Sequence, residues 1–138
     1  MNIDQQFTIT RTFTQADFNR FAALSGDDNP IHVDPAFSAR TKFGRTVAHG
    51  MLLYGTICGA ISAQFPGAQQ LEQDLRFPSP TYTDEEISVQ LTVKEINADT
   101  VRLEATIARP SGQVTCEGTT VIRLAIDYKS TASDDKPA

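Results

Sequence analysis

The sequence predicts an α+β domain in which an antiparallel sheet wraps around one long buried helix. Two observations lead to this prediction. Residues 50–65, GMLLYGTICGAISAQF, hold no charged side chain, and a helix that is apolar nearly all round is buried. From residue 71 onward, apolar and polar residues alternate in runs separated by short turns, which is typical of antiparallel strands with one covered face.

The first helix is predicted to begin at Thr14 and to end at Gly26. Thr14 and Asp17 have the spacing of a capping box, in which side chains satisfy the first backbone N–H groups. Phe13 and Phe18 stand where a hydrophobic staple would close the start of the helix. Gly26 suits the left-handed conformation that ends many helices.

A second, short helix is predicted over residues 35–41. Asp34 is a good N-cap, and Pro35 suits the first helical position because its fixed φ matches the helix. Residues 42–46, KFGRT, are predicted to form a loop that leads to the long apolar helix.

The long helix is predicted to run from about Gly50 to Phe65, where Pro66 follows and ends it. Gly55 and Gly59 lie near each other on one side of this helix, although each glycine lowers helix stability by about 1 kcal/mol relative to alanine. We therefore expect strands to pack closely against the glycine side.

Four alternating runs are predicted as strands. Pro78 and Pro80 restrict the first of them to a sheet edge or a bulged end. A helix followed by several antiparallel strands that curl around it is the arrangement called a hot-dog fold. The runs are Leu71–Phe77, Ile87–Val93, Val101–Ile107 and Val114–Ile126.

The chain is predicted to form one domain over residues 1–128. A length of 138 residues and a hydrophobic content of 40% suit a single packed core. Residues 129–138, KSTASDDKPA, have nothing to bury and are expected to be disordered. The open sheet leaves edge strands free, so we expect a homodimer or a higher homo-oligomer that covers them.

Charge and cysteine content exclude several classes of protein. A net charge of -5 argues against nucleic acid as the main partner, because phosphate binding needs a basic face. The uncharged stretch over residues 46–71 is interrupted by polar residues and falls short of a membrane span. Cys58 and Cys116 are isolated and favour reduced thiols in a cytoplasmic protein. Residues 1–6 are polar and do not indicate a secretory signal.

Residues 24–35, LSGDDNPIHVDP, concentrate polar and acidic side chains in one turn-prone stretch. By composition alone a plain turn is favoured. An acid–base site stays open, because a turn can bring Asp27 and His32 together. A metal site also stays open but is weaker, since the stretch lacks a His-x-x-x-His pair and the glycine spacing of a calcium loop.

Residues 45–53, RTVAHGMLL, cover the start of the long helix. The first N–H groups of a helix are unpaired, and the helix dipole favours negative charge there, so Gly50 is a candidate oxyanion donor. An ordinary helix start, where glycine allows close packing, is the other interpretation. For His49 we prefer a structural role as a hydrogen-bonded histidine.

Together the two segments are far more specific than either alone. SGDDNPIHVDPAFS resembles the hydratase motif of the MaoC-like (R)-specific enoyl-CoA hydratases, Gly-Asp-x-Asn-Pro-aliphatic-His. His49-Gly50-Met51 is similar to the His-Gly-Met start of the central helix in that family. The resemblance extends roughly over residues 13–124, and the family has the hot-dog fold.

The resemblance implies a reaction, the reversible syn addition of water to a trans-2-enoyl-CoA to give an (R)-3-hydroxyacyl-CoA. It makes Asp27 and His32 the catalytic pair, and it makes the Gly50 N–H the donor to the thioester oxygen. No metal or organic cofactor is expected, because the thioester already activates the alkene. The resemblance places further residues at or near the substrate: Ser25, Asn29, His49, Met51 and Cys58.

The sequence leaves some residue roles and functions open. Cys58 stands where the family often has a serine near the acyl pocket. A hot-dog acyl-CoA thioesterase and an acyl-CoA-binding or partner subunit of a heterodimeric dehydratase are the other candidate functions. Fatty-acid metabolism and polyhydroxyalkanoate supply both use hydratase chemistry. The acyl-chain length is open, and four residues are candidates for lining the pocket: Phe43, Leu53, Phe65 and Phe77.

Overall fold

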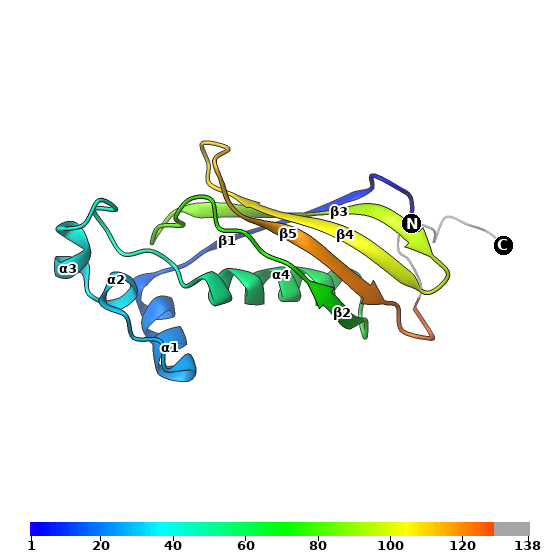
Figure 1. The fold of residues 1–138 in the computed structure, drawn as a ribbon, viewed down its shortest axis with the longest axis horizontal. Helices are drawn as coiled ribbons and strands as arrows, with labels where there is room; N and C mark the ends of the chain where they lie inside the picture. Colours follow the sequence, from blue (N-terminus) through cyan, green and yellow to red (C-terminus); the bar gives the residue numbers. More distant parts are fainter. Residues whose placement is uncertain (129–138) are drawn as a thin grey trace.

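The computed structural model describes residues 1–128, so the predicted disordered tail over residues 129–138 lies outside the described residues. Figure 1 shows the arrangement of the elements along the chain. In order they are β1 (Gln6–Thr12), α1 (Gln15–Ser25), α2 (Pro30–Val33), α3 (Pro35–Ala39), α4 (Gly50–Gln64), β2 (Gln69–Gln73), β3 (Glu86–Asn97), β4 (Thr100–Ala108) and β5 (Val114–Arg123).

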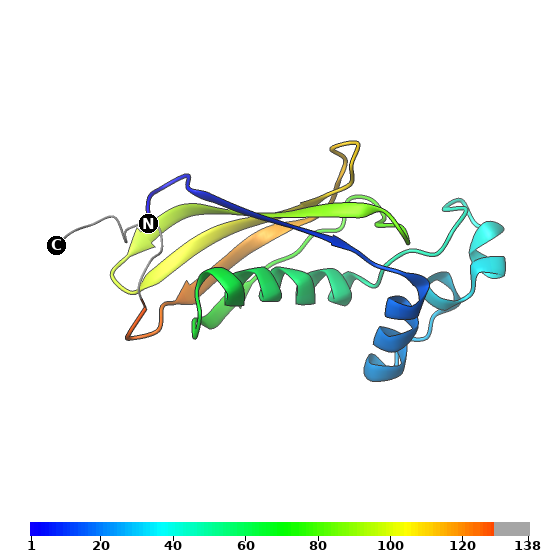
Figure 2. The same ribbon diagram turned by 180° about the vertical axis from the view of Figure 1, so that it is seen from behind.

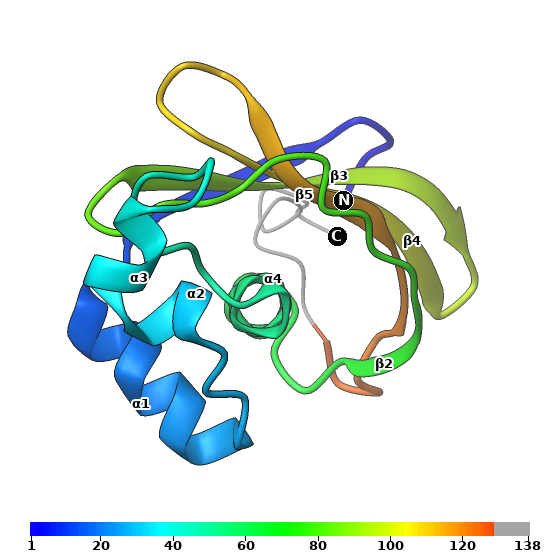
Figure 3. The same ribbon diagram turned by 60° about the vertical axis from the view of Figure 1, so that its left-hand side comes forward.

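The strands form one five-stranded antiparallel sheet with the order β1-β3-β4-β5-β2. From Ile87 to Val93 in β3 and throughout β4, every second side chain is buried and faces the core, as the alternating sequence predicts. Turned to look along α4, the structure shows the sheet curving over that helix (Figure 3). The fold prediction is therefore confirmed, and α4 is the helix inside the curved sheet.

The core lies between α4 and the concave face of the sheet. Leu53, Ile57 and Ile61 of α4 are at most 5% exposed and belong to the same apolar cluster as the inner residues of β3 and β4. Helices α1 to α3 lie beyond the first turn of α4, at one end of the sheet (Figure 2). The N-terminus of α4 therefore meets the segment that carries the acidic motif.

The prediction for the glycine side of α4 is wrong. A methyl group added at Gly55 or Gly59 would meet no atom within 4 Å, so none of the strands within residues 1–128 packs there. Met51, one turn before Gly55, is 52% exposed. The sheet covers only one side of the helix, and the opposite side of α4 is an apolar surface in the single chain.

Strand β1 is absent from the sequence prediction. Phe7 and Ile9 alternate with threonines, which is a period-two signal, although the strand is short. β1 pairs with β3, with Phe7 opposite Leu91 and Ile9 opposite Val89. It forms one edge of the sheet.

The other edge is β2, as the two prolines predict. This strand contains a register shift between Gln70 and Glu72, and it ends at Gln73, earlier than the predicted Phe77. The last strand also ends early, at Arg123, and Ile126 is fully exposed beyond it. Beyond β2 the regular ladder ends, although Asp74 and Arg76 still bond to the backbone of β5.

Helix α1 has the predicted ends. Thr14 and Asp17 form a complete capping box, and Gly26 adopts the left-handed conformation with φ 83°. Phe18 is completely buried. Within residues 1–128 we find no helix that is both long and apolar enough to cross a membrane.

Candidate active site

The motif segment contains a one-turn helix where the sequence predicts a turn. In α2, the Asn29 side chain accepts a hydrogen bond from the Ile31 N–H at 3.1 Å, and Pro30 occupies the first helical position. An asparagine cap followed by proline is enough to start a helical turn, because both favour the required backbone angles. Asp34 ends α2 and caps α3 by accepting from the Phe37 N–H at 3.0 Å.

Helix α2 places His32 toward the start of α4. The His32 Nδ1 lies 2.8 Å from the carbonyl oxygen of Val47. A carbonyl oxygen only accepts, so Nδ1 carries a hydrogen, and in the neutral ring the other nitrogen, Nε2, has a free lone pair. The Val47 carbonyl therefore orients the ring and selects its tautomer.

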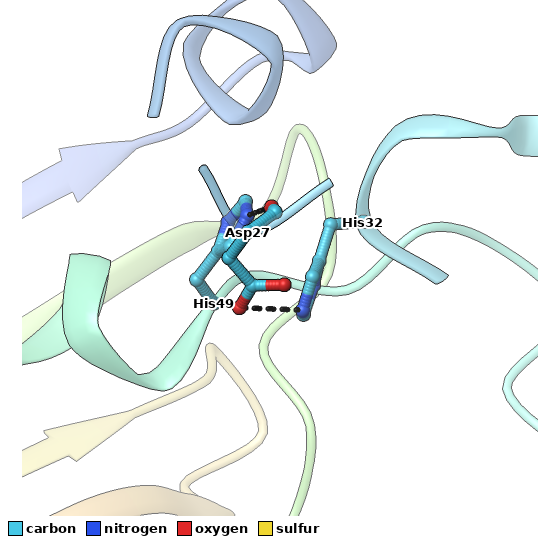
Figure 4. A group of neighbouring side chains, drawn as sticks. All are labelled: Asp27, His32 and His49. Carbon is cyan, nitrogen blue, oxygen red and sulfur yellow. Dashed lines mark hydrogen bonds and ion pairs between the residues drawn. The ribbon is translucent and has the colours of Figure 1, made fainter. Parts of the chain in front are cut away.

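The free nitrogen of His32 faces the carboxylate of Asp27, and Figure 4 shows the two side chains turned toward each other. The Nε2 to Oδ2 distance is 3.9 Å, and the side chains are 13% and 56% exposed respectively. This distance is too long for a direct hydrogen bond. It leaves both atoms free to hold the same water molecule.

Ser25 and Asn29 shape the loop around Asp27. The Ser25 hydroxyl donates to the Phe21 carbonyl at 2.7 Å and accepts from the Asp27 N–H at 3.1 Å. The Asn29 N–H donates to the Asp27 carboxylate at 3.4 Å. Neither Ser25 nor Asn29 lines the adjoining cavity, so the structure places them beside Asp27 and does not place them against a substrate.

Gly50 is the first residue of α4. Its N-cap, His49, makes no side-chain hydrogen bond to the helix. The N–H groups of Leu52 and Leu53 both bond to the His49 carbonyl, whereas the N–H of Gly50 has no partner within residues 1–128. The start of α4 thus offers a free donor where the helix dipole favours negative charge.

A cavity of about 730 Å³ joins these groups. Asp27, His32 and Gly50 all line it, as does Met51. Most of its surface is apolar, and Lys42 is the cation among its lining residues. The apolar and aromatic lining residues include Ile31, Phe43, Val47, Leu53, Phe77 and Tyr82.

Two candidates lie elsewhere. Cys58 is half-buried, and its Sγ lies 3.7 Å from the Gln70 side-chain oxygen, away from the cavity-lining residues. Phe65 is completely buried just after the far end of α4 and packs against Phe7 with ring centroids 5.5 Å apart. The structure therefore does not bring Cys58 or Phe65 to the cavity of this chain.

His49 is buried behind the catalytic pair and does not line the cavity. Its Nε2 lies 2.8 Å from the backbone carbonyl oxygen of Asp27. Its ring stacks on His32, with centroids 3.8 Å apart and an angle of 22° between the planes. Burial lowers the pKa of His49, although the Asp27 carbonyl opposes that shift.

Asp27, His32 and His49 have possible metal-ligand atoms within 4.8 Å of one another. The two imidazole rings are nearly parallel, so their lone pairs do not converge on a common ion. The Nε2 of His49 is also occupied by the Asp27 carbonyl. The arrangement therefore fits acid–base chemistry on a water molecule better than metal binding.

Several contributors to the site are missing from the sequence prediction, among them Val47 and Tyr82. Val47 acts through its backbone carbonyl, so its side chain carries no signal. Tyr82 reaches the cavity from the segment before β3, and the guanidinium groups of Arg45 and Arg109 lie 5.2 Å and 4.9 Å from the centroid of its ring. Fold and site together define a hot-dog protein with a carboxylate–imidazole pair in an apolar cavity.

Comparison with known proteins identifies the family. The MaoC like domain matches residues 2–111. An (R)-specific enoyl-CoA hydratase of Aeromonas caviae is 34% identical over 128 residues, which cover 90% of this chain and 96% of the relative. A second protein of that description, from Rhodospirillum rubrum, is 31% identical over 126 residues, covering 87% and 85%. The chain belongs to the MaoC-like family.

Solved structures agree with this assignment. The (R)-hydratase of A. caviae, described as involved in PHA biosynthesis, matches with a TM-score of 0.87 at 32% identity over 91% of this chain and 98% of that chain. An unliganded R-hydratase from Pseudomonas aeruginosa matches with a TM-score of 0.88 at 32% identity, over 95% and 86%. The fold predicted from periodicity is therefore the fold of these hydratases.

Proposed function

We propose that this protein is an (R)-specific enoyl-CoA hydratase, which adds water reversibly to a trans-2-enoyl-CoA. One observation carries the proposal: the Asp27 carboxylate and the free nitrogen of His32 lie 3.9 Å apart in a cavity whose wall includes Gly50. An acid–base pair beside a free helix N-terminus suits a reaction that moves protons while charge builds up on a thioester oxygen.

Asp27 and His32 hold one water molecule between them. One member of the pair takes a proton from the water as its oxygen attacks C3 of the enoyl group. A proton is then delivered to C2 from the same face, so that H and OH add syn and all atoms of the water enter the product. Positioned acid–base groups typically contribute about 10² to 10⁴ in rate.

Attack at C3 moves electrons toward the thioester and forms an enolate oxygen. The N–H of Gly50 donates to that oxygen, and one such donor typically contributes about 3 to 4 kcal/mol to the transition state. The proposed chemistry uses the thioester itself as the electron acceptor. The residues of this chain therefore need only bind, orient the water and move protons.

Hydration of crotonyl-CoA tests the proposal, because the conjugated absorbance of the substrate is lost as water adds. We expect the wild-type protein to form the (R)-3-hydroxyacyl-CoA. We expect Asp27→Asn and His32→Ala to abolish the loss of absorbance. Asp28→Asn is the matched control, since Asp28 neighbours the pair in sequence and does not line the cavity. Full activity in both Asp27→Asn and His32→Ala would contradict the assignment.

A second measurement separates the alternative functions. A thiol reagent added to the same reaction reports free CoA, which a thioesterase releases and a hydratase does not. Binding of crotonyl-CoA with neither absorbance loss nor thiol release would instead indicate a binding or partner subunit. A series of enoyl-CoA chain lengths then defines the acyl preference.

We also propose that the protein works as a homodimer in the cytoplasm. The apolar side of α4 around Met51, Gly55 and Gly59 is uncovered in the single chain, and a second copy would bury it. Cys58 and Cys116 are both free thiols, as is usual in a reducing compartment. We expect sedimentation to give a dimer, and Gly59→Arg, which adds a charge to this side, to give a monomer.

A further inference from the structure

The chemistry proposed above uses one of the two histidines of the chain and leaves His49 without a role. The His49 side chain is 1% exposed. Two phenylalanines of α1, Phe18 and Phe21, surround it with ring centroids at 6.4 Å and 4.8 Å. A polar ring in such a place lowers stability unless its hydrogen bonds are satisfied.

Only one nitrogen of His49 is satisfied. Nε2 lies 2.8 Å from the Asp27 carbonyl and must donate, because a carbonyl accepts. Nδ1 is buried and has no hydrogen-bond partner within residues 1–128. A hydrogen on Nδ1 would be an unsatisfied buried donor, so the ring is neutral and carries its hydrogen on Nε2.

His49 touches both members of the catalytic pair. Its hydrogen bond holds the main chain of Asp27, 22 residues earlier in the sequence. Its ring stacks against the ring of His32 at a centroid distance of 3.8 Å. The hydrogen bond to the Val47 carbonyl restrains rotation of the His32 ring within its plane. The stacked ring of His49 restrains the tilt of that plane.

We propose that His49 is a positioning residue for the hydratase reaction, which holds the Asp27 backbone and the His32 ring so that both face the same water. This inference rests on the proposed function. His49 reaches neither the cavity nor the reacting atoms, so it acts only through the pair. A displacement of about 1 Å at a reacting group can lower the rate by about 10²-fold.

The neutral state of His49 is part of this role. The titratable groups that face it are Asp27 and His32, and the α1 residues packed against it are uncharged. A positive His49 would repel a proton on His32 and would attract the Asp27 carboxylate away from the water. Burial favours the neutral ring of His49.

The ligand-free protein allows a direct test, since its two histidines give two sets of ring signals after selective ¹⁵N-histidine labelling. We expect opposite neutral tautomers, with the hydrogen of His49 on Nε2 and that of His32 on Nδ1. We also expect His49 to stay neutral to lower pH than a free histidine. A His49 ring that carries hydrogen on Nδ1, or that titrates as a free histidine does, would overturn the proposal.

Two variants separate the two contacts in kinetic measurements. His49→Phe keeps an aromatic ring against His32 but loses the donor to Asp27. His49→Gln keeps an N–H donor but loses the ring. We expect each variant to lower kcat about 10- to 100-fold with KM changed less than about threefold, because substrate contacts are intact. Unchanged kcat in both variants, or a change confined to KM, would overturn the proposal.

Ile57→Ala is the control for stability. Ile57 is completely buried in the core and does not line the cavity, so this variant lowers thermal stability while kcat is retained. If Ile57→Ala lowered kcat as much as the His49 variants do, their effect would be general loosening and the positioning role would be wrong. Inactivity of the wild type on every enoyl-CoA would instead contradict the proposed function, and the labelled-histidine spectra would still decide the placement of His49.

Discussion

Gly50→Ala adds one methyl group at the proposed oxyanion donor, and the structure predicts where that methyl would collide. An ideal Cβ at Gly50 would lie 2.8 Å from Cζ of Phe77 and 3.0 Å and 3.2 Å from the two Cε atoms. Carbon atoms in contact prefer about 3.5 to 4.0 Å. The end of the Phe77 ring would therefore have to move by about 1 Å.

Gly50→Ala should change the stability of the protein only slightly. Phe77 is 45% exposed, so its ring can rotate at a small cost. Gly50 is in a helix, where alanine is more favourable than glycine by about 1 kcal/mol. We expect the free energy of unfolding to change by less than about 1 kcal/mol, because the two effects oppose each other.

Activity should respond much more than stability. Phe77 lines the same cavity as the catalytic pair, so a displaced ring occupies space that the thioester needs beside the Gly50 N–H. We expect kcat/KM for crotonyl-CoA to fall about tenfold or more, corresponding to about 1.4 kcal/mol. The absorbance assay measures this loss, and chemical denaturation measures stability in parallel.

Removal of the colliding ring tests the steric explanation. In the double variant Gly50→Ala/Phe77→Ala the methyl group has room, and we expect kcat/KM to return to the value of Phe77→Ala alone. Full activity of Gly50→Ala would refute the collision. If Phe77→Ala alone is active but the double variant has the low kcat/KM of Gly50→Ala, the methyl group disturbs the N–H donor directly. The collision with Phe77 would then not be the cause.

Three further predictions concern stability and thiol reactivity. Leu103→Ala should lower the free energy of unfolding by about 2 to 5 kcal/mol in a denaturant titration, because Leu103 is completely buried; a loss below 1 kcal/mol would contradict its core position. The hydrogen bonds from Arg109 hold the pKa of Glu85 below its usual 4.5, so this pair stabilises the fold above that value and the contribution is lost as the pH falls through the lowered pKa. Glu85→Gln should therefore lower stability by about 1 kcal/mol at neutral pH, and this effect should shrink as the pH falls through the lowered pKa. A loss that does not depend on pH would exclude the ion pair as the cause. Burial raises the pKa of the Cys116 thiol to about 11, so a thiol reagent should modify Cys116 only when the protein unfolds, as mass spectrometry would show; rapid labelling of the native protein would contradict this.

Local sequence was sufficient for most of the elements, although β1 and α2 were not predicted, and for the catalytic candidates. The capping box of α1 and the left-handed Gly26 depend on residues within one helical turn, so their spacing predicts them correctly. The alternation in β3 and β4 likewise records which face is buried. Asp27, His32 and Gly50 were recognisable because each belongs to a short motif.

Only the tertiary structure decided which side of α4 the sheet covers and what surrounds the catalytic pair. A helix without charged residues has no polar face to mark its exposed side, so the uncovered side at Gly55 and Gly59 could not be inferred from composition. The contacts of His49 with Asp27 and His32, and of Phe77 with Gly50, join segments far apart in the chain. Such contacts arise where the motif segment and the segment after β2 meet the start of α4, and no local pattern encodes their distances.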